Sequence, residues 1–377
     1  MTTSALPPEA WSAALAGLPG MGPARLLAVL RRWGPADAWE RLLRRAWLRE
    51  RDVVGVAGSD PKGLAALWST TVAATDVAAV WQRHVDAGIG VISLHSSAYP
   101  AALAGDVEPP AVVFVRGDPT AIAGPRVAIV GTRGATRYGL DLAFELGRDL
   151  AGAGVAIVSG LALGIDGASH AGALAAATAP PIAVVGSGLD VVYPRRHEQL
   201  WREVERCGVV LSEAPLGAPP ERWRFPARNR VIAALADVLV VVESRDRGGS
   251  MHTVAEAVRR GRPVFAAPGP IRSATSVGTN RLLRDGAHVL CDAGDVLLAL
   301  GLSSALCRSV RDGRPEPSPA DAEVLEAVGW SPVSLDTLAS RTQLPLGQLA
   351  LALDRLRDSG WLAERAGWLE RVARSDA

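Results

Sequence analysis

The alternation of apolar runs and amphipathic segments between residues 126 and 266 constrains the fold more than any other feature. Strands that are apolar throughout, separated by helices, are typical of a parallel sheet covered on both faces. The sequence therefore predicts a Rossmann-like, doubly wound α/β domain. The predicted strands are 127–130, 155–158, 182–185, 209–211, 238–242 and 263–266, and the predicted helices are 137–152, 168–177, 198–206, 228–236 and 250–260.

The regions on either side of this domain predict smaller modules. The first sixty or so residues indicate short helices, and two further strands are expected at 91–94 and 111–115. A charged, proline-rich stretch at 311–319 is typical of a linker. Three helices and a ribbon after it outline a winged helix-turn-helix. We expect a helical module at 1–75, the Rossmann-like domain at 76–306, a linker at 307–319 and a winged-helix domain at 320–377.

The connection Gly20-Met21-Gly22 in the first module resembles a helix-hairpin-helix turn. In that motif, glycines allow close backbone approach, and free amides of the second helix face a phosphate. A packing module with a simple glycine turn would have the same sequence. Both interpretations stay open at this point.

Composition limits the kind of protein. The net charge is only +1 and 49% of residues are hydrophobic, so a nucleic-acid site must come from local clustering of arginine. Lys62 is the sole lysine. Cys207, Cys291 and Cys307 are widely spaced, which argues against a disulfide framework or a structural zinc site. We expect a reducing compartment, no membrane span and a cytoplasmic location.

The stretch 221–230 sets four arginines beside Trp223 and Phe225, directly ahead of an apolar run. Guanidinium groups pair with phosphate oxygens and aromatic faces stack on bases, which is how single-stranded nucleic acids are bound. A solvated, arginine-rich loop is the alternative interpretation.

Small residues recur just after the predicted strands, where open parallel sheets bind ligands. Glycine permits close backbone approach, and the helices that follow point free amides into the same crevice. Arg133 is placed among them. The sequence therefore predicts an anion site at one edge of the sheet. The loops begin with Gly131-Thr132-Arg133-Gly134, Ser159-Gly160, Gly186-Ser187-Gly188, Ser212-Glu213 and Arg247-Gly248-Gly249-Ser250.

Several chemistries are not supported. The first loop lacks the dinucleotide fingerprint Gly-x-Gly-x-x-Gly, and no Walker A motif is present, so we expect neither NAD nor ATP as a cofactor. Asp166 and His170 could share a helix face as metal ligands, but a cap and a buried, hydrogen-bonded histidine are favoured. Glu213 and Glu243 have no evident nucleophile partner. We therefore expect no catalysis, no cofactor and no metal.

These residues carry a family resemblance: the chain looks like a member of the DNA-processing protein A (DprA/Smf) family. The matching motifs run in the family's order over roughly residues 91–290, and the pairing of SGLALGID with FPARNR is the most specific part. The other motifs are VAIVGTRGATRYG at 127–139, Tyr193-Pro194, Leu211-Ser212-Glu213, Gly249-Ser250-Met251-His252-Thr253 and Pro268-Gly269.

The resemblance implies a non-catalytic protein that binds single-stranded DNA without sequence preference. It also implies delivery of that strand to the RecA recombinase in natural transformation, and a homodimer. Carried over position by position, the expected single-strand site is Gly131, Thr132, Arg133, Ser159, Gly160, Arg222, Phe225, Arg228, Asn229, Gly249 and Ser250. Two positions depart from the family's pattern: Ser250-Met251-His252-Thr253 replaces the commoner Ser-Leu-Ile-Thr, and Leu163 stands where many relatives have arginine.

Two other functions stay open on sequence alone. Gly248-Gly249 followed by Thr253 and Glu256 resembles the loop of lysine-decarboxylase-like phosphoribohydrolases, although its spacing is one residue longer. A winged-helix transcription factor should carry basic residues on its third helix, and only Arg355 and Arg357 do, late in that helix.

Overall fold

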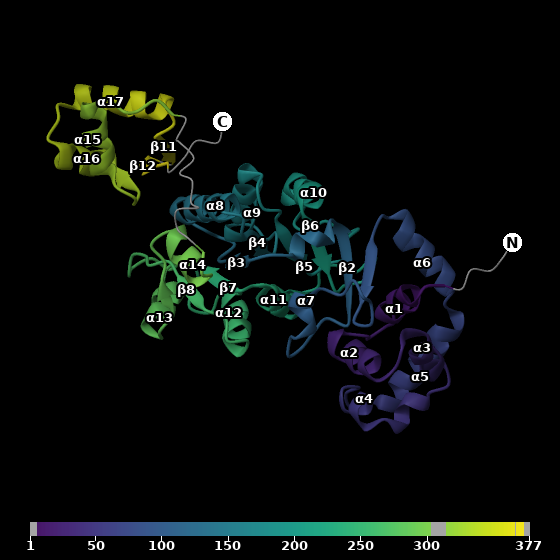
Figure 1. Cartoon of the computed structure of the whole chain (residues 1–377). Coiled ribbons are helices and arrows are strands. Elements are labelled where there is room, and N and C mark those ends of the chain that lie inside the picture. Colours follow the sequence, from purple (N-terminus) through teal and green to yellow (C-terminus); the bar gives the residue numbers. More distant parts are fainter. Residues whose placement is uncertain (1–5, 303–313, 366, 373–377) are drawn as a thin grey trace.

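The computed structural model describes residues 6–302, 314–365 and 367–372. Its N-terminal part is a module of helices that packs around the buried indoles of Trp47 and Trp68. Figure 1 shows this module beyond the sheet's β1–β2 edge. Helices continue to Asp86, farther than the expected boundary at residue 75. The elements are α1 (Pro8–Ala16), α2 (Pro23–Arg32), α3 (Pro35–Leu43), η1 (Ala46–Arg49), α4 (Arg51–Gly55), α5 (Pro61–Ala74) and α6 (Val77–Asp86).

A nine-stranded sheet forms the central domain, in the order β1-β2-β6-β5-β4-β3-β7-β8-β9. The pairings from β6 to β9 are parallel, and β1 and β2 add an antiparallel edge. The strands are β1 (Gly90–Ser93), β2 (Val112–Gly117), β3 (Arg126–Val130), β4 (Ala156–Ser159), β5 (Ile182–Val185), β6 (Val209–Ser212), β7 (Val238–Val241), β8 (Val264–Ala266) and β9 (His288–Val289).

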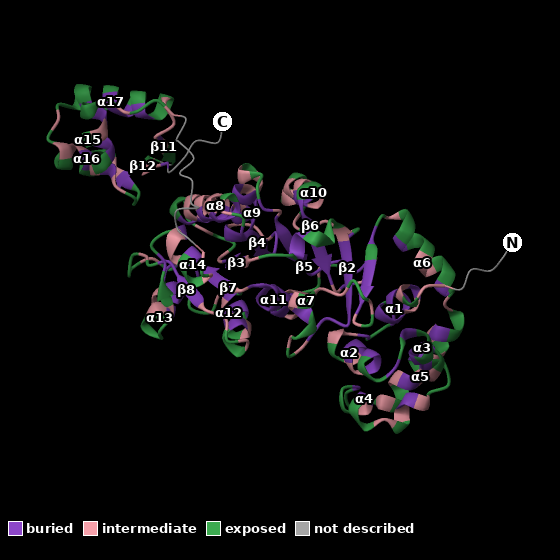
Figure 2. Cartoon of the chain, viewed as in Figure 1, coloured by how far each residue is buried: buried purple, intermediate pink, exposed green. Residues whose placement is uncertain are grey.

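Helices cover both faces of this sheet, as Figure 1 shows. Alternate residues of β3 enter two separate cores: Val127 and Ile129 pack with α8 on one face, and Ala128 and Val130 pack with α11 on the other. Figure 2 shows that the strands between these layers are buried. The helices are α7 (Ala101–Ala104), η2 (Pro119–Ile122), α8 (Arg137–Gly152), α9 (Ile165–Ala176), η3 (Arg195–His197), α10 (Glu198–Cys207), α11 (Arg224–Leu235), α12 (Ser250–Arg259), α13 (Val277–Arg284) and α14 (Ala293–Ala299).

The chain builds outward from β3 to β6 and then returns through α11 to β7, on the other side of β3. This reversal creates a topological switch point between β3 and β7, at the carboxyl ends of the strands. Ligands of open α/β sheets bind in the crevice at such a point. The predicted Rossmann-like, doubly wound sheet is therefore confirmed, and its topology fixes where a ligand is expected.

The structure differs from the sequence prediction at several elements. Helix α11 begins at Arg224, four residues before the predicted start at Arg228, so Phe225 and Pro226 lie in its first turn. A helix tolerates proline there because the amides of the first turn have no intrahelical acceptor. The prediction also contained none of the elements α13, β9 and α14.

The C-terminal part is the predicted winged helix. Its core includes Val324, Leu338 and Leu353, one from each of three helices, closed by a three-stranded sheet of order β10-β12-β11. The elements are α15 (Pro319–Val328), β10 (Val333–Ser334), α16 (Leu335–Thr342), α17 (Leu346–Asp358), β11 (Leu362–Arg365) and β12 (Trp368–Arg371). Cys307, one of the cysteines considered above, lies outside the described residues.

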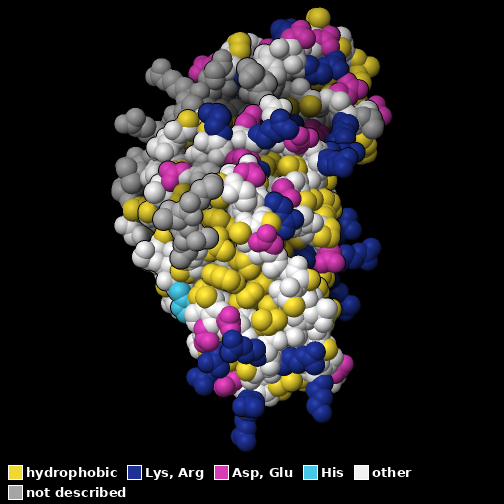
Figure 3. Space-filling view, turned by 90° about the vertical axis from the view of Figure 1, so that its right-hand side faces the viewer, with side chains coloured by type: hydrophobic (Ala, Val, Ile, Leu, Met, Phe, Trp, Pro, Cys, Tyr) yellow, Lys and Arg dark blue, Asp and Glu magenta, His cyan; other side chains and the backbone are white. Residues whose placement is uncertain are grey.

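Figure 3 views the molecule from the side of the helical module, where hydrophobic side chains gather in the middle of the face and arginines surround them. In the described part of the chain, no single helix is long and apolar enough to cross a membrane. Only α5 and α6 taken together pass that test on length and composition, and they are bent by 73° relative to each other.

Candidate nucleic-acid interface

A cleft of about 670 Å³ lies at the switch point, between the loops after β3 and β7 and the first turns of α11 and α12. We call it the switch-point cleft. Nine of the eleven predicted site residues line it: Gly131, Thr132, Arg133, Arg222, Phe225, Arg228, Asn229, Gly249 and Ser250. The structure therefore brings together residues that are up to 119 positions apart, from 131 to 250.

Three exposed arginines at this cleft have no carboxylate partner. Arg133, Arg222 and Arg245 line the cleft, and no ion pair or side-chain hydrogen bond engages their guanidinium groups within the described residues. Arg247 beside them is likewise exposed and unpaired in the described part of the chain. Exposed guanidinium groups without a counterion are free to bind phosphate oxygens.

The arginines of the 221–230 stretch divide into different roles. Arg224 pairs with Glu221 at 3.0 Å, and Arg230 pairs with Glu213 and donates to the Glu108 carbonyl. Arg222 is the exposed and unpaired one. The sequence pattern alone does not distinguish these four arginines. Arg224 and Arg230 have carboxylate partners and Arg228 is buried, so Arg222 is the one available at the surface.

Phe225 sits in an aromatic and cationic cluster. The Arg133 Cζ lies 5.1 Å from the centroid of the Phe225 ring, and the Tyr193 ring lies 5.5 Å away with an interplanar angle of 41°. A guanidinium within about 6 Å of an aromatic ring is attracted to its face. The cluster thus places a charge for phosphate beside rings that can stack on bases.

Arg228 is buried below the cleft surface, with 7% of its area exposed. Its Nη1 donates to the Val184 carbonyl, while its Nε has no acceptor among the described residues. Burial lowers the pKa of Arg228 to about 10, although the Asp166 carboxylate opposes this shift. A buried cation that is only partly compensated is unfavourable, so it favours an anion in the cleft above it.

Ser159 at the end of β4 and Gly160 after it lie beneath the cleft. Ser159 is fully buried, and its hydroxyl donates to the Ile129 carbonyl at 2.6 Å. Its side chain was predicted to contact a ligand, but it is not available to one. A Cβ on Gly160 would overlap the Arg228 guanidinium. Glycine is required at position 160 because the arginine occupies that space. Neither residue lines the switch-point cleft.

Two helix N-termini border the cleft. Gly249 precedes α12, and Ser250 is its first residue, with its hydroxyl 2.8 Å from that of Ser244. Asn229 Nδ2 donates to the Gly249 carbonyl at 3.4 Å, a contact that links α11 to this loop. Free amides and the positive end of the helix dipole favour anions at such positions.

The carboxylates considered as bases have structural partners. Glu243 accepts hydrogen bonds from the Thr136 amide at 2.9 Å, from the Thr136 hydroxyl at 2.6 Å and from the Thr275 hydroxyl at 3.2 Å. Glu213 pairs with Arg230. The hydrogen bonds of Glu243 connect the loops after β3 and β7. Partners of this kind allow Glu243 to be buried and Glu213 to be largely buried.

Asp166 and His170 lie one turn apart on α9. Asp166 lies in the first turn of α9, whose N-cap is Gly164, so the predicted capping role was wrong. Burial raises the pKa of Asp166, and burial lowers the pKa of His170 to about 3, which keeps the imidazole neutral. Among the described residues, no three His, Cys, Asp or Glu side chains form a candidate metal-binding group.

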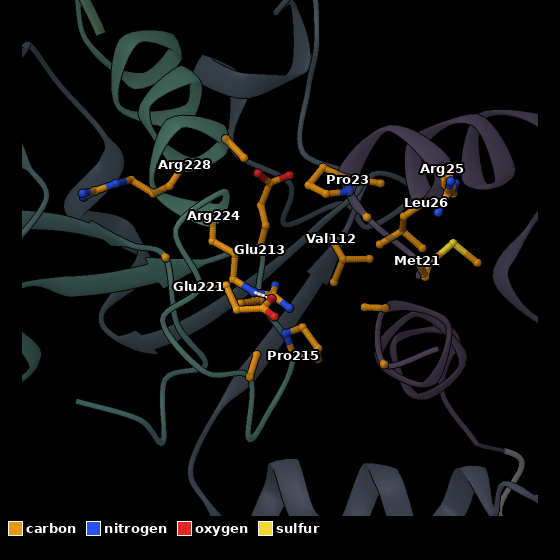
Figure 4. A pocket seen from close by; sticks show the side chains of 18 of the residues that line it. Met21, Pro23, Arg25, Leu26, Val112, Glu213, Pro215, Glu221, Arg224 and Arg228 are labelled. Carbon is orange, nitrogen blue, oxygen red and sulfur yellow. Dashed lines mark hydrogen bonds and ion pairs between the residues drawn. The ribbon is translucent and has the colours of Figure 1, made fainter. Parts of the chain in front are cut away.

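A second cleft of about 790 Å³ separates the helical module from α11, and we call it the interdomain cleft. Figure 4 shows Met21, Pro23 and Leu26 on one side, the Arg224–Glu221 pair on the other, and Arg228 pointing away. Arg25 near its rim donates to the carbonyls of Gly20, Val56 and Ala57. Arg25 therefore links the glycine turn at Gly20 to the segment 56–57 of the same helical module.

The predicted site lacked several residues that line the cleft, among them Tyr193, Arg245 and His252. Tyr193 was noted as part of a motif, but its ring contact with Phe225 depends on how the loop after β5 folds. Arg245 follows β7 by four residues. Its position in a loop after a strand was the available signal.

The fold and the cleft define a class of protein: a Rossmann-like domain with a basic cleft that contains an aromatic ring at its switch point. Comparison with known proteins agrees with this class. The family model described as DNA recombination-mediator protein A matches residues 90–301, and that of the DprA winged helix domain matches residues 311–356. The chain belongs to the DNA recombination-mediator protein A (DprA/Smf) family.

Individual relatives extend this result. Protein Smf of Escherichia coli is 35% identical over 293 residues, which cover 76% of this chain and 78% of that protein. DNA processing protein DprA of Bacillus subtilis is 38% identical over 210 residues, or 55% of this chain and 70% of that protein.

Two solved structures are also similar. DNA processing protein A of Streptococcus pneumoniae has a TM-score of 0.64 at 30% identity, covering 78% of this chain and 98% of that one. DNA processing protein A of Helicobacter pylori, studied for its single-stranded DNA binding mode, has a TM-score of 0.51 at 30% identity, covering 56% and 95%.

Proposed function

We propose that this protein binds single-stranded DNA without sequence preference in the switch-point cleft. The observation that carries the proposal is a set of three arginines, Arg133, Arg222 and Arg245, that have no ion pair among the described residues and line the same cleft as Phe225. Arginines bind the backbone and aromatic rings bind bases of any sequence, so this arrangement suits a strand with exposed bases. The single-strand binding described for the Helicobacter pylori relative supports the same ligand class.

The proposal includes a role in DNA processing in the cytoplasm. We propose, from the family resemblance, that the bound strand is protected and then delivered to the RecA recombinase during natural transformation, and that the protein acts as a homodimer. To test delivery, nuclease resistance of a labelled oligo-dT and its rate of RecA assembly would be measured with and without this protein. Slower digestion together with faster RecA assembly is expected. Unchanged assembly would remove the RecA role. Light scattering during size-exclusion chromatography tests the dimer.

We propose no catalytic step. Glu256, the acidic residue of the phosphoribohydrolase-like pattern, does not line the switch-point cleft and pairs with Arg260. Glu213 and Glu243 are held by the partners described above. Incubation with adenosine monophosphate should release no adenine above background. Release that depends on Glu256 would contradict the non-catalytic proposal.

A further inference from the structure

Tyr193 extends the aromatic surface beyond the switch point. It follows β5, two strands away from β3, and 39% of its area is exposed. Its ring contacts Phe225, whose own ring already lies beside the Arg133 guanidinium. Phe225 is only partly exposed, whereas Tyr193 offers an open face next to it. A base that follows the one at Phe225 would therefore meet the tyrosine ring.

Unpaired positive charge continues beyond Tyr193. Arg195 and Arg196 follow it directly in η3, and both are exposed. Neither makes an ion pair or a side-chain hydrogen bond within the described residues, while the next arginine along the chain, Arg202, pairs with Glu198. Two free guanidinium groups beside an exposed ring repeat the combination seen around Phe225.

These groups lie along one edge of the sheet. The loops after β7, β3, β4 and β5 are successive neighbours, so they span three strand spacings, or about 14 Å. Arg245 stands at the β7 end, Arg133 in the middle and Tyr193 at the β5 end. The rule for open sheets places a ligand at the switch point alone. The exposed side chain of Tyr193 extends the proposed binding surface beyond the switch point.

The other direction out of the cleft is less suited to a strand. Trp223 is 48% exposed at the rim of the interdomain cleft, but Arg224 stacks on its ring at 4.5 Å and its indole N–H donates to Glu221. Glu221 and Glu213 also line that cleft, and each engages an arginine in an ion pair, so Arg224 and Arg230 are not free to bind phosphate there. Of these two directions, only the one across Tyr193 has exposed arginines without an ion pair among the described residues.

We infer that a bound single strand leaves the switch-point cleft across Tyr193, with a base stacked on its ring and the following phosphates held by Arg195 and Arg196. This inference rests on the proposed single-strand function. It assigns a second subsite, with nucleobase and phosphate as its ligands, to the loop after β5.

The test uses the full chain and oligo-dT in anisotropy titrations over a salt series. Tyr193→Leu retains bulk against Phe225 but lacks a π face, and we expect about 5- to 100-fold weaker binding with an unchanged salt slope. The double variant Arg195→Ala/Arg196→Ala should flatten the slope by about 1.4 units, from two lost contacts to a single strand. Arg202→Ala is the matched control and should bind like wild type.

A direct readout accompanies the titrations: oligo-dT carrying one 5-iodouracil is crosslinked by light, and the adduct is located by mass spectrometry. An adduct on Tyr193 is expected. If Arg133→Ala weakens binding but the Tyr193 and Arg195/Arg196 variants do not, and no adduct forms on Tyr193, the inference is overturned while the proposed function stands. Loss of binding only in Trp223→Ala would also overturn it. If wild type fails to bind oligo-dT, the proposed function itself fails.

Discussion

The switch-point cleft and helix α17 of the winged helix both carry arginines, but the two regions differ in whether these arginines have carboxylate partners. Arg133, Arg222 and Arg245 are exposed at the cleft without carboxylate partners in the described part of the chain. In the winged helix, Arg355 pairs with Asp321 at 2.6 Å, and Arg357 pairs with Asp354 and Glu364. The difference teaches that the availability of a charge, which depends on its neighbours, decides whether an arginine can bind DNA.

The face of α17 supports this contrast. Its first half exposes Leu346 and Leu351, and its basic residues lie in the last turns. A DNA-reading helix presents polar and basic side chains from its N-terminal part. The comparison therefore favours the sheet domain as the place of the proposed single-strand binding and predicts little contribution from α17.

The largest expected effect comes from removing the free charges. The triple variant Arg133→Ala/Arg222→Ala/Arg245→Ala should weaken oligo-dT binding by about 100-fold or more and flatten the salt slope by about 2 units, since each lost phosphate contact on a single strand contributes about 0.7. Anisotropy titrations between low and moderate salt measure both quantities.

A matched control removes three paired charges. Arg32, Arg41 and Arg44 of the helical module pair with Glu50, Asp37 and Glu40. Replacing these three by alanine changes the net charge by the same amount. If this control reduces affinity as much as the cleft variant does, overall charge rather than the cleft would account for binding.

Removing the aromatic ring should have a smaller and different effect. Phe225→Ala is expected to weaken binding by about 5- to 100-fold with little change in the salt slope, because stacking releases few ions. Phe225→Tyr retains a ring and should stay close to wild type. A change in slope as large as that of an arginine variant would show that the ring acts by positioning Arg133.

Acidification should destabilise the sheet domain more than it destabilises the winged helix. His170 is buried with a pKa of about 3, so between pH 6.5 and 3 the unfolded chain binds a proton that the folded sheet domain does not. His170 by itself should then lower the free energy of unfolding by about 1.4 kcal/mol for each pH unit of acidification, and the raised pKa of Asp166 acts in the opposite direction. Asp321 differs, because its hydrogen bond with Arg355 lowers its pKa and its stabilising effect persists until the pH falls below about 3.8.

Calorimetry at pH 6.5 and 4.5 would measure this difference, with the sheet-domain transition falling more than that of the winged helix. His170→Gln should remove part of the sheet domain's pH dependence. An NMR titration of wild type gives a second readout: a His170 signal that titrates near pH 6.5 would contradict the account.

The smallest effect is expected from the winged helix. Arg355→Ala/Arg357→Ala should leave both the affinity for oligo-dT and its salt slope within error of wild type, since these guanidinium groups are already paired. The same anisotropy titration serves. A salt slope flattened by one unit or more would contradict the contrast between the cleft and α17 and would indicate that α17 binds DNA directly.

The sequence predicted the sheet because β3 to β8 are continuous apolar runs, a pattern that burial on both faces imposes. It missed β9 because His288 and Val289 form a two-residue strand with both side chains exposed. It placed the start of α11 too late because Pro226 suggested a loop, although proline fits a first helical turn.

The candidate site was only partly predictable for a related reason. Strand ends and glycines specify where a ligand lies, so the cleft could be located from the chain. Whether Arg228 is buried under Gly160, or Arg230 neutralised by Glu213, depends on packing between distant segments. Local sequence carries no signal for such contacts.

The most direct test of the central claim is an anisotropy titration of labelled oligo-dT, competed with unlabelled single strand and duplex across a salt series. We predict that wild type prefers the single strand and binds more weakly as salt increases. The Arg133→Ala/Arg222→Ala/Arg245→Ala variant should lose about 2 units of that salt slope. Equal competition by duplex, or a slope that the triple variant leaves unchanged, would contradict the assignment of the switch-point cleft as the DNA site.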